Sequence, residues 1–244
     1  MDSDDDSLTL SSHALSALAE FRREEKEKVE QLEKLYKEAD ENFKSTKKKI
    51  SIDAFQEDWQ LSQFWYSDET AAKLGRALLE GADEDTVIVV ASAPSVYAAI
   101  KNFSESTIPT KHIYLLEYDK RFEILAGSSH FRFYDYTKPK DIPNELRHKC
   151  HRLLIDPPFL EETCQRNSAI AARELLTIEK TSVTAKGDRK YKLISSTGER
   201  MKNLIEKEYP ETRMTDFIPE HKNGLSNEFR CYASFECSEW KFSK

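Results

Sequence analysis

Residues 153–159 of this chain, Leu-Leu-Ile-Asp-Pro-Pro-Phe, place an apolar run directly before an acid, two prolines and an aromatic ring. Such a run is typical of a buried parallel strand, and open α/β sheets bind their ligands where these strands end. The two prolines, of which Pro157 is the first, hold the chain extended and remove two backbone donors, so nearby carbonyl oxygens face outward. Asp156 and these carbonyls can accept the hydrogens of an amine, while the ring of Phe159 can cover a cationic or planar group. Taken alone, the motif is equally compatible with a strand-ending turn that carries a surface acid.

Acids follow two further apolar runs. Glu117 stands at the end of one of them, where a single carboxylate can accept both hydrogens of a ribose diol. Asp135 lies between two tyrosines after another run, so the acid can accept from an adenine amino group while a ring such as Tyr136 stacks on the base. Together with Asp156, these residues predict an adenosyl site along one edge of a sheet.

The turn at residues 91–95, Ala-Ser-Ala-Pro-Ser, follows the first apolar run and uses small residues and a proline where nucleotide sites usually have glycines. The chain has only 6 glycines and no G-x-G-x-x-G. A loop that cradles phosphates is therefore not expected, which argues against a dehydrogenase or a nucleotidase. Acids at three strand ends and no phosphate loop favour a cationic adenosyl cofactor, and S-adenosylmethionine fits because its sulfonium is positively charged.

Apolar runs alternate with helical patterns over most of the chain, which predicts a mostly parallel α/β sheet with helices on both faces and an antiparallel edge. Ser67 is expected to cap the first helix, and Ser196, Thr197 and Gly198 to stop the fifth strand. Strands are expected at 87–91, 113–116, 131–134, 152–155, 191–195, 212–217 and 229–235, helices at 68–79, 96–103, 161–178 and 200–207, and a polar loop at 181–190.

The chain has 244 residues, which suffices for one α/β domain and a terminal appendage. Residues 1–50 predict an acidic tail followed by a charged helix with an interrupted apolar stripe, and residues 51–244 the folded domain. The helix is expected to pack one face on the domain or on a partner rather than to form a coiled coil by itself.

Composition narrows the class of function. A net charge of -7 with 33% charged residues makes nucleic acid an unlikely partner, because proteins that bind phosphates usually present a basic face. The 4 cysteines form no C-x-x-C pair, so we expect neither a metal site nor disulfides. No signal peptide or membrane-spanning run is evident, and a cytoplasmic monomer is the simplest expectation.

Six blocks in order resemble the eukaryotic lysine methyltransferases of translation elongation factor 1-alpha, which were once described as N6-adenine DNA methyltransferases because of the D-P-P-F/Y element. The resemblance covers about residues 8–232, and the chain departs from the family pattern at 177–192 and 238–244. The six blocks are L-S-Q-F-W-Y-S (61–67), S-A-P-S-V-Y (92–97), E-Y-D-K-R-F (117–122), F-Y-D-Y (133–136), D-P-P-F (156–159) and N-E-F-R-C-Y (227–232).

The resemblance implies a Rossmann-like, seven-stranded class I methyltransferase domain that moves a methyl group from S-adenosylmethionine to a lysine ε-amine of the elongation factor, with S-adenosylhomocysteine as the product. It implies catalytic roles in the acceptor pocket for Asp156, Pro157 and Phe159. The cofactor-binding residues that it implies are Phe64, Trp65, Tyr66 and Ser67 at the methionine end, Ser92, Ala93, Pro94 and Ser95 in the turn beside the cofactor, Glu117 and Tyr118 at the ribose, and Asp135 and Tyr136 at the adenine.

Two other functions are compatible with the same motif. One is methylation of adenine N6 in nucleic acid, against which the acidic balance and the lack of a separate base-flipping domain both count. The other is a non-catalytic adaptor that binds the cofactor or merely keeps the fold. A basic protein substrate, by contrast, would be attracted to an acidic enzyme.

Overall fold

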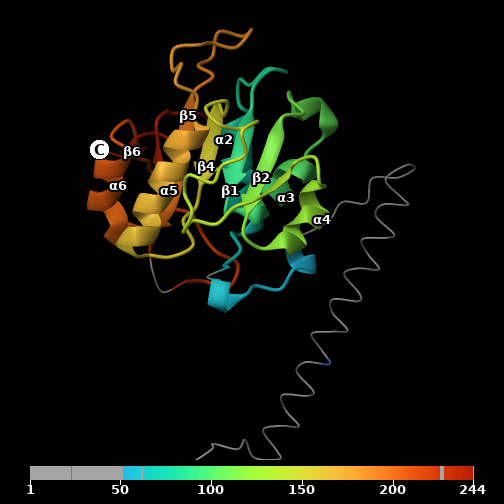
Figure 1. Cartoon of the computed structure of the whole chain (residues 1–244). Helices are drawn as coiled ribbons and strands as arrows, with labels where there is room; N and C mark the ends of the chain where they lie inside the picture. Colours follow the sequence, from blue (N-terminus) through green and yellow to red (C-terminus); the bar gives the residue numbers. More distant parts are fainter. Residues whose placement is uncertain (1–22, 24–51, 62, 226–227, 244) are drawn as a thin grey trace, which may run out of the picture. The chain divides into compact units, whose positions relative to one another are not determined.

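The computed structural model describes Arg23 and residues 52–61, 63–225 and 228–243. All of these except Arg23 lie in the unit that spans residues 49–244, and Figure 1 shows how its helices and strands are arranged. The tail and helix predicted for residues 1–50 fall almost entirely outside the described residues. The predicted domain boundary at residue 51 stays a prediction.

A mixed sheet of seven strands forms the centre of this unit, in the order β3-β2-β1-β4-β5-β7-β6. Neighbouring strands from β3 to β5 pair in parallel, whereas β7 runs antiparallel to both β5 and β6. The mostly parallel sheet with an antiparallel edge is therefore confirmed. The strands are β1 (Ile88–Ala91), β2 (Ile113–Glu117), β3 (Phe131–Phe133), β4 (Arg152–Ile155), β5 (Lys192–Gly198), β6 (Arg213–Met214) and β7 (Phe229–Ala233).

Helices cover both faces of the sheet (Figure 1). Helices α2 and α3 pack against each other and contact β1, β2 and β4, while α5 contacts β4 and α6. The α-helices are α2 (Asp68–Leu79), α3 (Pro94–Asn102), α4 (Glu123–Ala126), α5 (Glu162–Leu175) and α6 (Lys202–Glu208), and short 3₁₀ helices lie at η1 (Ile52–Ala54), η2 (Trp59–Leu61), η3 (Glu105–Thr107), η4 (Lys120–Phe122) and η5 (Glu199–Met201).

The central strands are buried on both faces, as their continuous apolar runs predict. In β1, Ile88, Val89, Val90 and Ala91 are all 0% exposed, although successive side chains point to opposite faces. On one of these faces, Val89 belongs to a core cluster that also contains residues of α5 and α6. This double burial holds the strand ends rigidly, so the residues that follow them have fixed positions.

Several strand ends differ from the expectation. The strand predicted at 212–217 is limited to Arg213–Met214, and the one predicted at 229–235 ends at Ala233. The fifth strand differs in the other direction. The sequence predicts that Ser196, Thr197 and Gly198 stop the fifth strand, but β5 continues through all three. The cause is the antiparallel pairing with β7, in which Ser196 lies opposite Cys231 and Gly198 opposite Phe229. Ladder hydrogen bonds and full burial outweigh the low strand propensity of serine and glycine.

The polar stretch at 181–190 forms the predicted loop, the orange segment that projects at the top of Figure 1. It precedes β5 and contacts Asp83, which precedes β1: Ala185 N donates to Asp83 Oδ2 over 3.1 Å, and Lys190 Nζ lies 3.4 Å from the same oxygen. The loop therefore lies at the amino ends of the parallel strands. The departure from the family pattern at 177–192 is thus remote from the carboxyl edge of the sheet.

Candidate active site

A cavity of about 610 Å³ opens at the carboxyl edge of the sheet. Its wall combines the residues that follow β1, β2, β3 and β4 with the segment that precedes α2. The structure thus brings all but two of the predicted site residues together. The predicted residues that line the cavity are Phe64, Trp65, Ser92, Ala93, Pro94, Ser95, Glu117, Tyr118, Asp135, Tyr136, Asp156, Pro157 and Phe159.

Tyr66 and Ser67 are the two predicted site residues outside this lining. Ser67 caps α2, because its hydroxyl oxygen accepts a hydrogen bond from Thr70 N over 3.2 Å. This is the capping role that the sequence predicts for it. Tyr66 is 1% exposed and points its hydroxyl beneath the cavity wall, toward Asp156 and Ser196. A cofactor-binding role for either residue stays a prediction.

The turn after β1 adopts a conformation that glycine usually supplies. Ser92 has a φ of 58°, in the left-handed region, and its N–H donates to Leu116 O over 2.9 Å. Pro94 then starts α3 with a backbone angle that suits the first turn of a helix. Small side chains at 92, 93 and 95 keep this wall of the cavity close to the backbone.

Glu117 ends β2 inside the cavity and is only 7% exposed. Burial raises the pKa of its carboxyl to about 7, and the negative charge of Asp119 adds to this rise. Backbone N–H groups oppose the rise: Tyr118 N donates to Glu117 Oε1 over 2.9 Å, and Asp119 N donates over 3.4 Å. A carboxyl held in this way presents an acceptor to the cavity and takes up or releases a proton near neutral pH.

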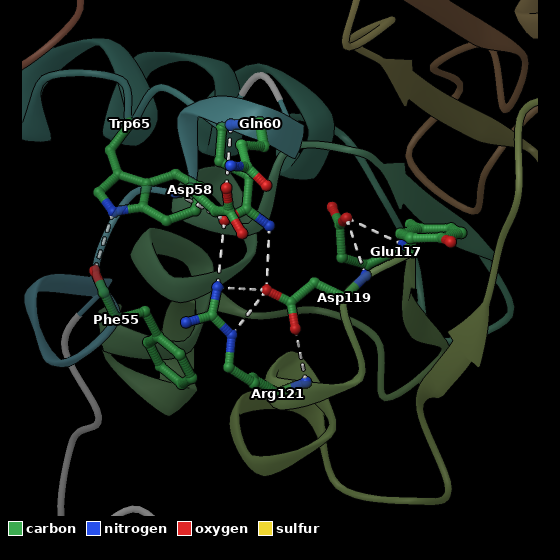
Figure 2. Close-up of polar contacts among 9 residues, drawn as sticks. Phe55, Asp58, Gln60, Trp65, Glu117, Asp119 and Arg121 are labelled. Carbon is green, nitrogen blue, oxygen red and sulfur yellow. Dashed lines mark hydrogen bonds and ion pairs between the residues drawn. The ribbon is translucent and has the colours of Figure 1, made fainter. Parts of the chain in front are cut away.

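A polar network connects β2 with the segment that precedes α2 (Figure 2). Gln63 Nε2 donates to Asp119 Oδ2 over 3.0 Å, and Arg121 Nε donates to the same oxygen over 2.8 Å. Asp58 N in turn donates to Gln63 Oε1 over 3.1 Å. The network therefore holds the wall formed by Gln63, Phe64 and Trp65 beside Glu117.

Asp135 lies in a turn after β3. Its Oδ1 accepts from Thr137 N over 2.9 Å and from the Thr137 hydroxyl over 2.7 Å. Tyr136 follows, and its ring centroid lies 5.7 Å from that of Phe159. Two aromatic rings from different strand ends thus face the same cavity.

Asp156 follows β4 and is half-buried at the cavity wall. Burial raises the pKa of its carboxyl to about 8, and the nearby Glu117 carboxyl adds to the rise. A hydrogen bond from the Tyr66 hydroxyl opposes it. The position of Asp156 is set by its backbone, whose N–H donates to Ala91 O of β1 over 3.1 Å.

The corner after Asp156 is braced from two sides. Gln165 Nε2 of α5 donates to Phe159 O over 3.1 Å and to Thr197 Oγ1 of β5 over 3.0 Å. Arg200 donates from Nη2 to Leu160 O. The carbonyls of Phe159 and Leu160 are thus engaged within the protein, which corrects the expectation that carbonyls near the prolines all face outward.

Several cavity residues carry no signal in the sequence. His221 reaches the cavity from the chain between β6 and β7, and Phe229 reaches it from the start of β7. The His221 ring lies 4.7 Å from that of Tyr66 and 4.5 Å from that of Phe229. Burial lowers the pKa of His221 to about 4, so its imidazole is neutral at pH 7. The pairing of residues 66 and 221 is tertiary, and no local spacing indicates it.

The cavity also has lining residues that the sequence analysis did not assign to the site. These are Leu61, Gln63, Tyr134, Thr137, Pro158, Leu160, Arg200 and Leu225.

The cavity suits a cationic adenosyl ligand better than a phosphorylated one. Two carboxyls, Glu117 and Asp156, line it from the ends of β2 and β4, the two strands that flank β1, and several aromatic rings belong to the same wall. A sulfonium would lower the free energy of both ionised carboxylates, whereas a phosphate would raise it. The volume also lies in the range of small-molecule sites.

Neither a cluster of metal ligands nor a membrane-spanning helix is present among the described residues. No three His, Cys, Asp or Glu side chains come together there as metal ligands would. Within the same part of the chain, no helix combines the length and the apolar character that a membrane crossing demands. The expectation of no bound metal stays a prediction.

Known proteins are similar to this chain over most of its length. Residues 57–237 match the family model described as "Probable N6-adenine methyltransferase". The chain is 61% identical over 235 residues to the protein named "Protein-lysine N-methyltransferase EFM5" of Saccharomyces cerevisiae, which covers 96% of this chain and 95% of that protein. It is 36% identical over 234 residues to human "EEF1A lysine methyltransferase 1", covering 96% and 94% respectively.

Among solved structures, the fold is similar to that of a branched-chain polyamine synthase mutein from Thermus thermophilus, crystallised with N4-aminopropylspermidine and 5'-methylthioadenosine. The TM-score is 0.52 at 13% identity, over 73% of this chain and 59% of that one. At this identity the similarity concerns the fold alone, and it agrees with the Rossmann-like arrangement of the sheet.

Proposed function

This chain belongs to the family of eukaryotic EEF1A lysine methyltransferases that the N6-adenine methyltransferase model also describes, and on that premise we propose that it methylates a lysine ε-amine of translation elongation factor 1-alpha. The methyl donor in this proposal is S-adenosylmethionine, and S-adenosylhomocysteine is the product. The observation that supports it best is the convergence of Asp156, Phe159 and Glu117 on one cavity.

The cofactor supplies an electrophilic methyl group on a cationic sulfur. In the proposed arrangement, Glu117 accepts the ribose hydroxyls and Asp135 faces the adenine. The segment 64–65 and the turn 92–95 hold the methionine end and the adjacent backbone. Asp156, Pro157 and Phe159 then form the acceptor side.

The chemical demand on the acceptor side is a neutral amine in line with the sulfur–methyl bond. A lysine amine has a pKa of about 10.4, so presenting it neutral at pH 7 costs roughly 4 to 5 kcal/mol. Burial and a neighbouring sulfonium both lower the amine pKa. Asp156 orients the amine through a hydrogen bond, the rings of Phe159 and Tyr136 exclude water, and the proton leaves to solvent at the cavity mouth.

The name of the matching family model favours adenine N6 as a second acceptor, and a labelling experiment separates the alternatives. Purified protein is incubated with methyl-labelled cofactor and either purified elongation factor or a cytosolic extract, and the products are treated with protease or nuclease. Label that protease releases, and that mass spectrometry places on a lysine, supports the proposal. Label that nuclease releases supports adenine methylation, and absence of label supports the adaptor.

Asp156→Ala tests the role of the acceptor corner. We expect turnover to fall by about 100-fold or more, in the range of a reacting group that is misplaced by about 1 Å, while the cofactor Kd changes by only a few-fold. Steady-state kinetics and calorimetry measure the two quantities. Asp141→Ala, which removes an exposed acid outside the cavity lining, is the control. Equal losses in turnover and in cofactor affinity would show that Asp156 builds the cofactor site instead.

A cytoplasmic location and a monomeric state belong to the same proposal. All 4 cysteines are buried free thiols, as expected in a reducing compartment. Cell fractionation tests the cytoplasmic location, and light scattering of the purified protein tests the monomeric state.

A further inference from the structure

A single basic side chain stands out in the wall of the cavity. Among the described residues that line it, Arg200 is the one lysine or arginine. It lies in η5, directly after β5, and its side chain is exposed. The carboxyls of the same wall belong to Glu117, Asp135 and Asp156. A fixed cation opposes the entry of a cationic cofactor or of a protonated lysine, so its place at the cavity needs an explanation.

The end of β5 fixes the position of Arg200. Glu199 N donates to Glu228 O over 2.7 Å, which ties the residue before Arg200 to the chain that leads into β7. Gly198 leaves room for the loop after β4, since a Cβ at this position would lie 2.8 Å from Leu160 Cδ1. Arg200 Nη2 in turn donates to the Leu160 carbonyl. The guanidinium is therefore held beside the loop that follows β4.

The order of the strands assigns Arg200 to the acceptor side of the cavity. In the order β2-β1-β4-β5, the end of β4 separates the end of β2 from that of β5. Glu117, the proposed ribose ligand, ends β2, and Asp156 follows β4. A cofactor that lies across the ends of β2 and β1 leaves the β5 side of Asp156 to the acceptor. Arg200 is exposed on that side, where the neighbours of a target lysine remain when its side chain enters the cavity.

Most donors of the Arg200 guanidinium are available to a ligand. A guanidinium presents a rigid fork of N–H groups, and within the described residues Leu160 O is the acceptor that this one contacts. Two carboxylates close to it in the fold are engaged by another arginine. Glu199 Oε2 lies 3.1 Å from Arg230 Nη2, and Glu228 Oε2 lies 3.0 Å from the same nitrogen. The described part of the chain therefore supplies no carboxylate to Arg200.

We propose that Arg200 is a specificity-determining residue that binds a carboxylate of the substrate protein, supplied by an aspartate or glutamate close to the target lysine. This inference rests on the proposed lysine methyltransferase function. A guanidinium fork matches the two oxygens of a carboxylate with parallel hydrogen bonds. The same charge disfavours lysines in wholly basic surroundings, which the acidic enzyme would otherwise attract. Arg200 thus selects among lysines by what lies beside them.

A double-mutant cycle between enzyme and substrate tests the inference. Mass spectrometry of the labelled elongation factor identifies the methylated lysine, and each surface aspartate or glutamate around it is changed to asparagine or glutamine. Arg200→Gln removes the charge on the enzyme. We expect it to lower kcat/KM about tenfold or more, mainly through KM, as for a lost hydrogen bond between charged groups. One of the substrate changes should cause a similar loss with the unmodified enzyme and little further loss with Arg200→Gln.

Two further variants separate recognition from bracing of the loop. Arg200→Lys keeps the charge and loses the fork, so its kcat/KM should lie between those of the unmodified enzyme and Arg200→Gln. Arg166→Gln is the matched control, because Arg166 of α5 lies outside the cavity lining and forms ion pairs with Glu162 and Glu208. Its kcat/KM should equal that of the unmodified enzyme. Added salt should reduce the difference between Arg200→Gln and the unmodified enzyme, because it screens exposed charges.

The outcomes separate this inference from the proposed function. If the unmodified protein transfers no label to a lysine, the proposed function fails and this inference with it. If the protein is active but Arg200→Gln lowers kcat equally for every substrate variant, or weakens the cofactor Kd instead, the recognition role is overturned. If Arg200→Gln does not fold, the substrate variants decide with the unmodified enzyme, and an unchanged KM for all of them overturns the inference.

Discussion

Two carboxyls in one small cavity dominate the chemistry of this protein at the scale of single residues. Glu117 and Asp156 follow adjacent regions of the parallel sheet, and burial raises both pKa values, to about 7 and about 8. The Glu117 carboxyl also raises the pKa of Asp156 through like-charge repulsion, and Asp119 does the same to the pKa of Glu117. The ligand-free protein therefore carries protons at this site that a cationic ligand would displace.

Cofactor affinity should depend on pH through Glu117. A ribose diol needs the ionised carboxylate, so below about pH 7 binding must also remove a proton, and affinity should fall by up to about tenfold per pH unit. S-adenosylmethionine should show a steeper dependence than neutral S-adenosylhomocysteine, because its sulfonium also interacts with Asp156. Calorimetry between about pH 6 and about pH 8 measures both affinities.

Glu117→Gln is the matched variant for this prediction. It keeps the shape of the side chain and cannot ionise, so its cofactor affinity should be weaker and nearly independent of pH in the same range. A flat dependence in the unmodified protein would contradict a role for this carboxyl at the ribose.

At the scale of elements, the cavity depends on a segment that belongs to no long helix or strand. Leu61, Gln63, Phe64 and Trp65 of this segment line the cavity, and the Gln63–Asp119–Arg121 network connects the segment to β2 (Figure 2). Arg121 also forms an ion pair with Asp119 at 2.6 Å, which lowers the pKa of the Asp119 carboxyl against the opposing effect of burial. The position of this cavity wall is therefore set by a few polar contacts.

Arg121→Gln should loosen this wall. The Asp119 carboxylate would keep only Gln63 as its side-chain donor, so we expect cofactor affinity to fall by about tenfold, as for the loss of a charged hydrogen bond worth about 1.5 kcal/mol or more. The control is Arg132→Gln, which breaks an ion pair with Glu145 on the exposed side of β3. Equal cofactor Kd values for the two variants would rule out the wall-positioning role.

Ser67→Ala distinguishes a helix cap from a cofactor contact. Loss of the cap on α2 should lower the free energy of unfolding by about 1 kcal/mol. The cofactor Kd should not change, because the hydroxyl accepts from Thr70 N and lies outside the cavity lining. Denaturant titration and calorimetry measure the two effects. A weaker cofactor Kd with unchanged stability would instead support the binding role that the family resemblance implies.

At the scale of the whole molecule, the Glu117 and Asp156 carboxyls make the stability of the fold depend on pH. Their folded pKa values lie above those of the unfolded chain, so the folded protein holds protons that the unfolded chain has released, and stability falls as pH rises toward the folded pKa. His221, with its lowered pKa, acts in the opposite sense, but only below its unfolded value near 6.5. The decrease in stability that the two carboxyls cause should therefore be measurable between about pH 6.5 and about pH 8.

We expect the melting temperature of the ligand-free protein to decrease across that interval. Asp156→Asn should reduce the decrease and stabilise the protein at about pH 8 by roughly 1 to 3 kcal/mol, a figure that allows for the partial exposure of this side chain. Differential scanning calorimetry of this variant and of the control Asp141→Asn measures the effect. A variant less stable than the unmodified protein at every pH would show that the carboxylate is a net stabilising group.

The sequence by itself determined the elements of the sheet and the chemistry at their ends. Strand β4 was predicted at its observed limits, Glu117 ends β2, and Asp135 and Asp156 follow β3 and β4 as expected. Apolar runs specify strands locally, and polar residues directly after parallel strands must meet at one edge. The family resemblance added the prediction that residues 64–67, directly before α2, bind the cofactor.

Only the tertiary structure decided how that edge is completed. The extension of β5 through Ser196, the approach of His221 to Tyr66 and the hydrogen bond from Tyr66 to Ser196 all depend on pairings between distant segments. The sequence signals at these positions pointed elsewhere: Ser196 resembled a strand terminator, and Tyr66 a residue of the cavity wall. The local propensities of these side chains are weak compared with the ladder bonds and burial that fix them, so their partners became visible only in the folded chain.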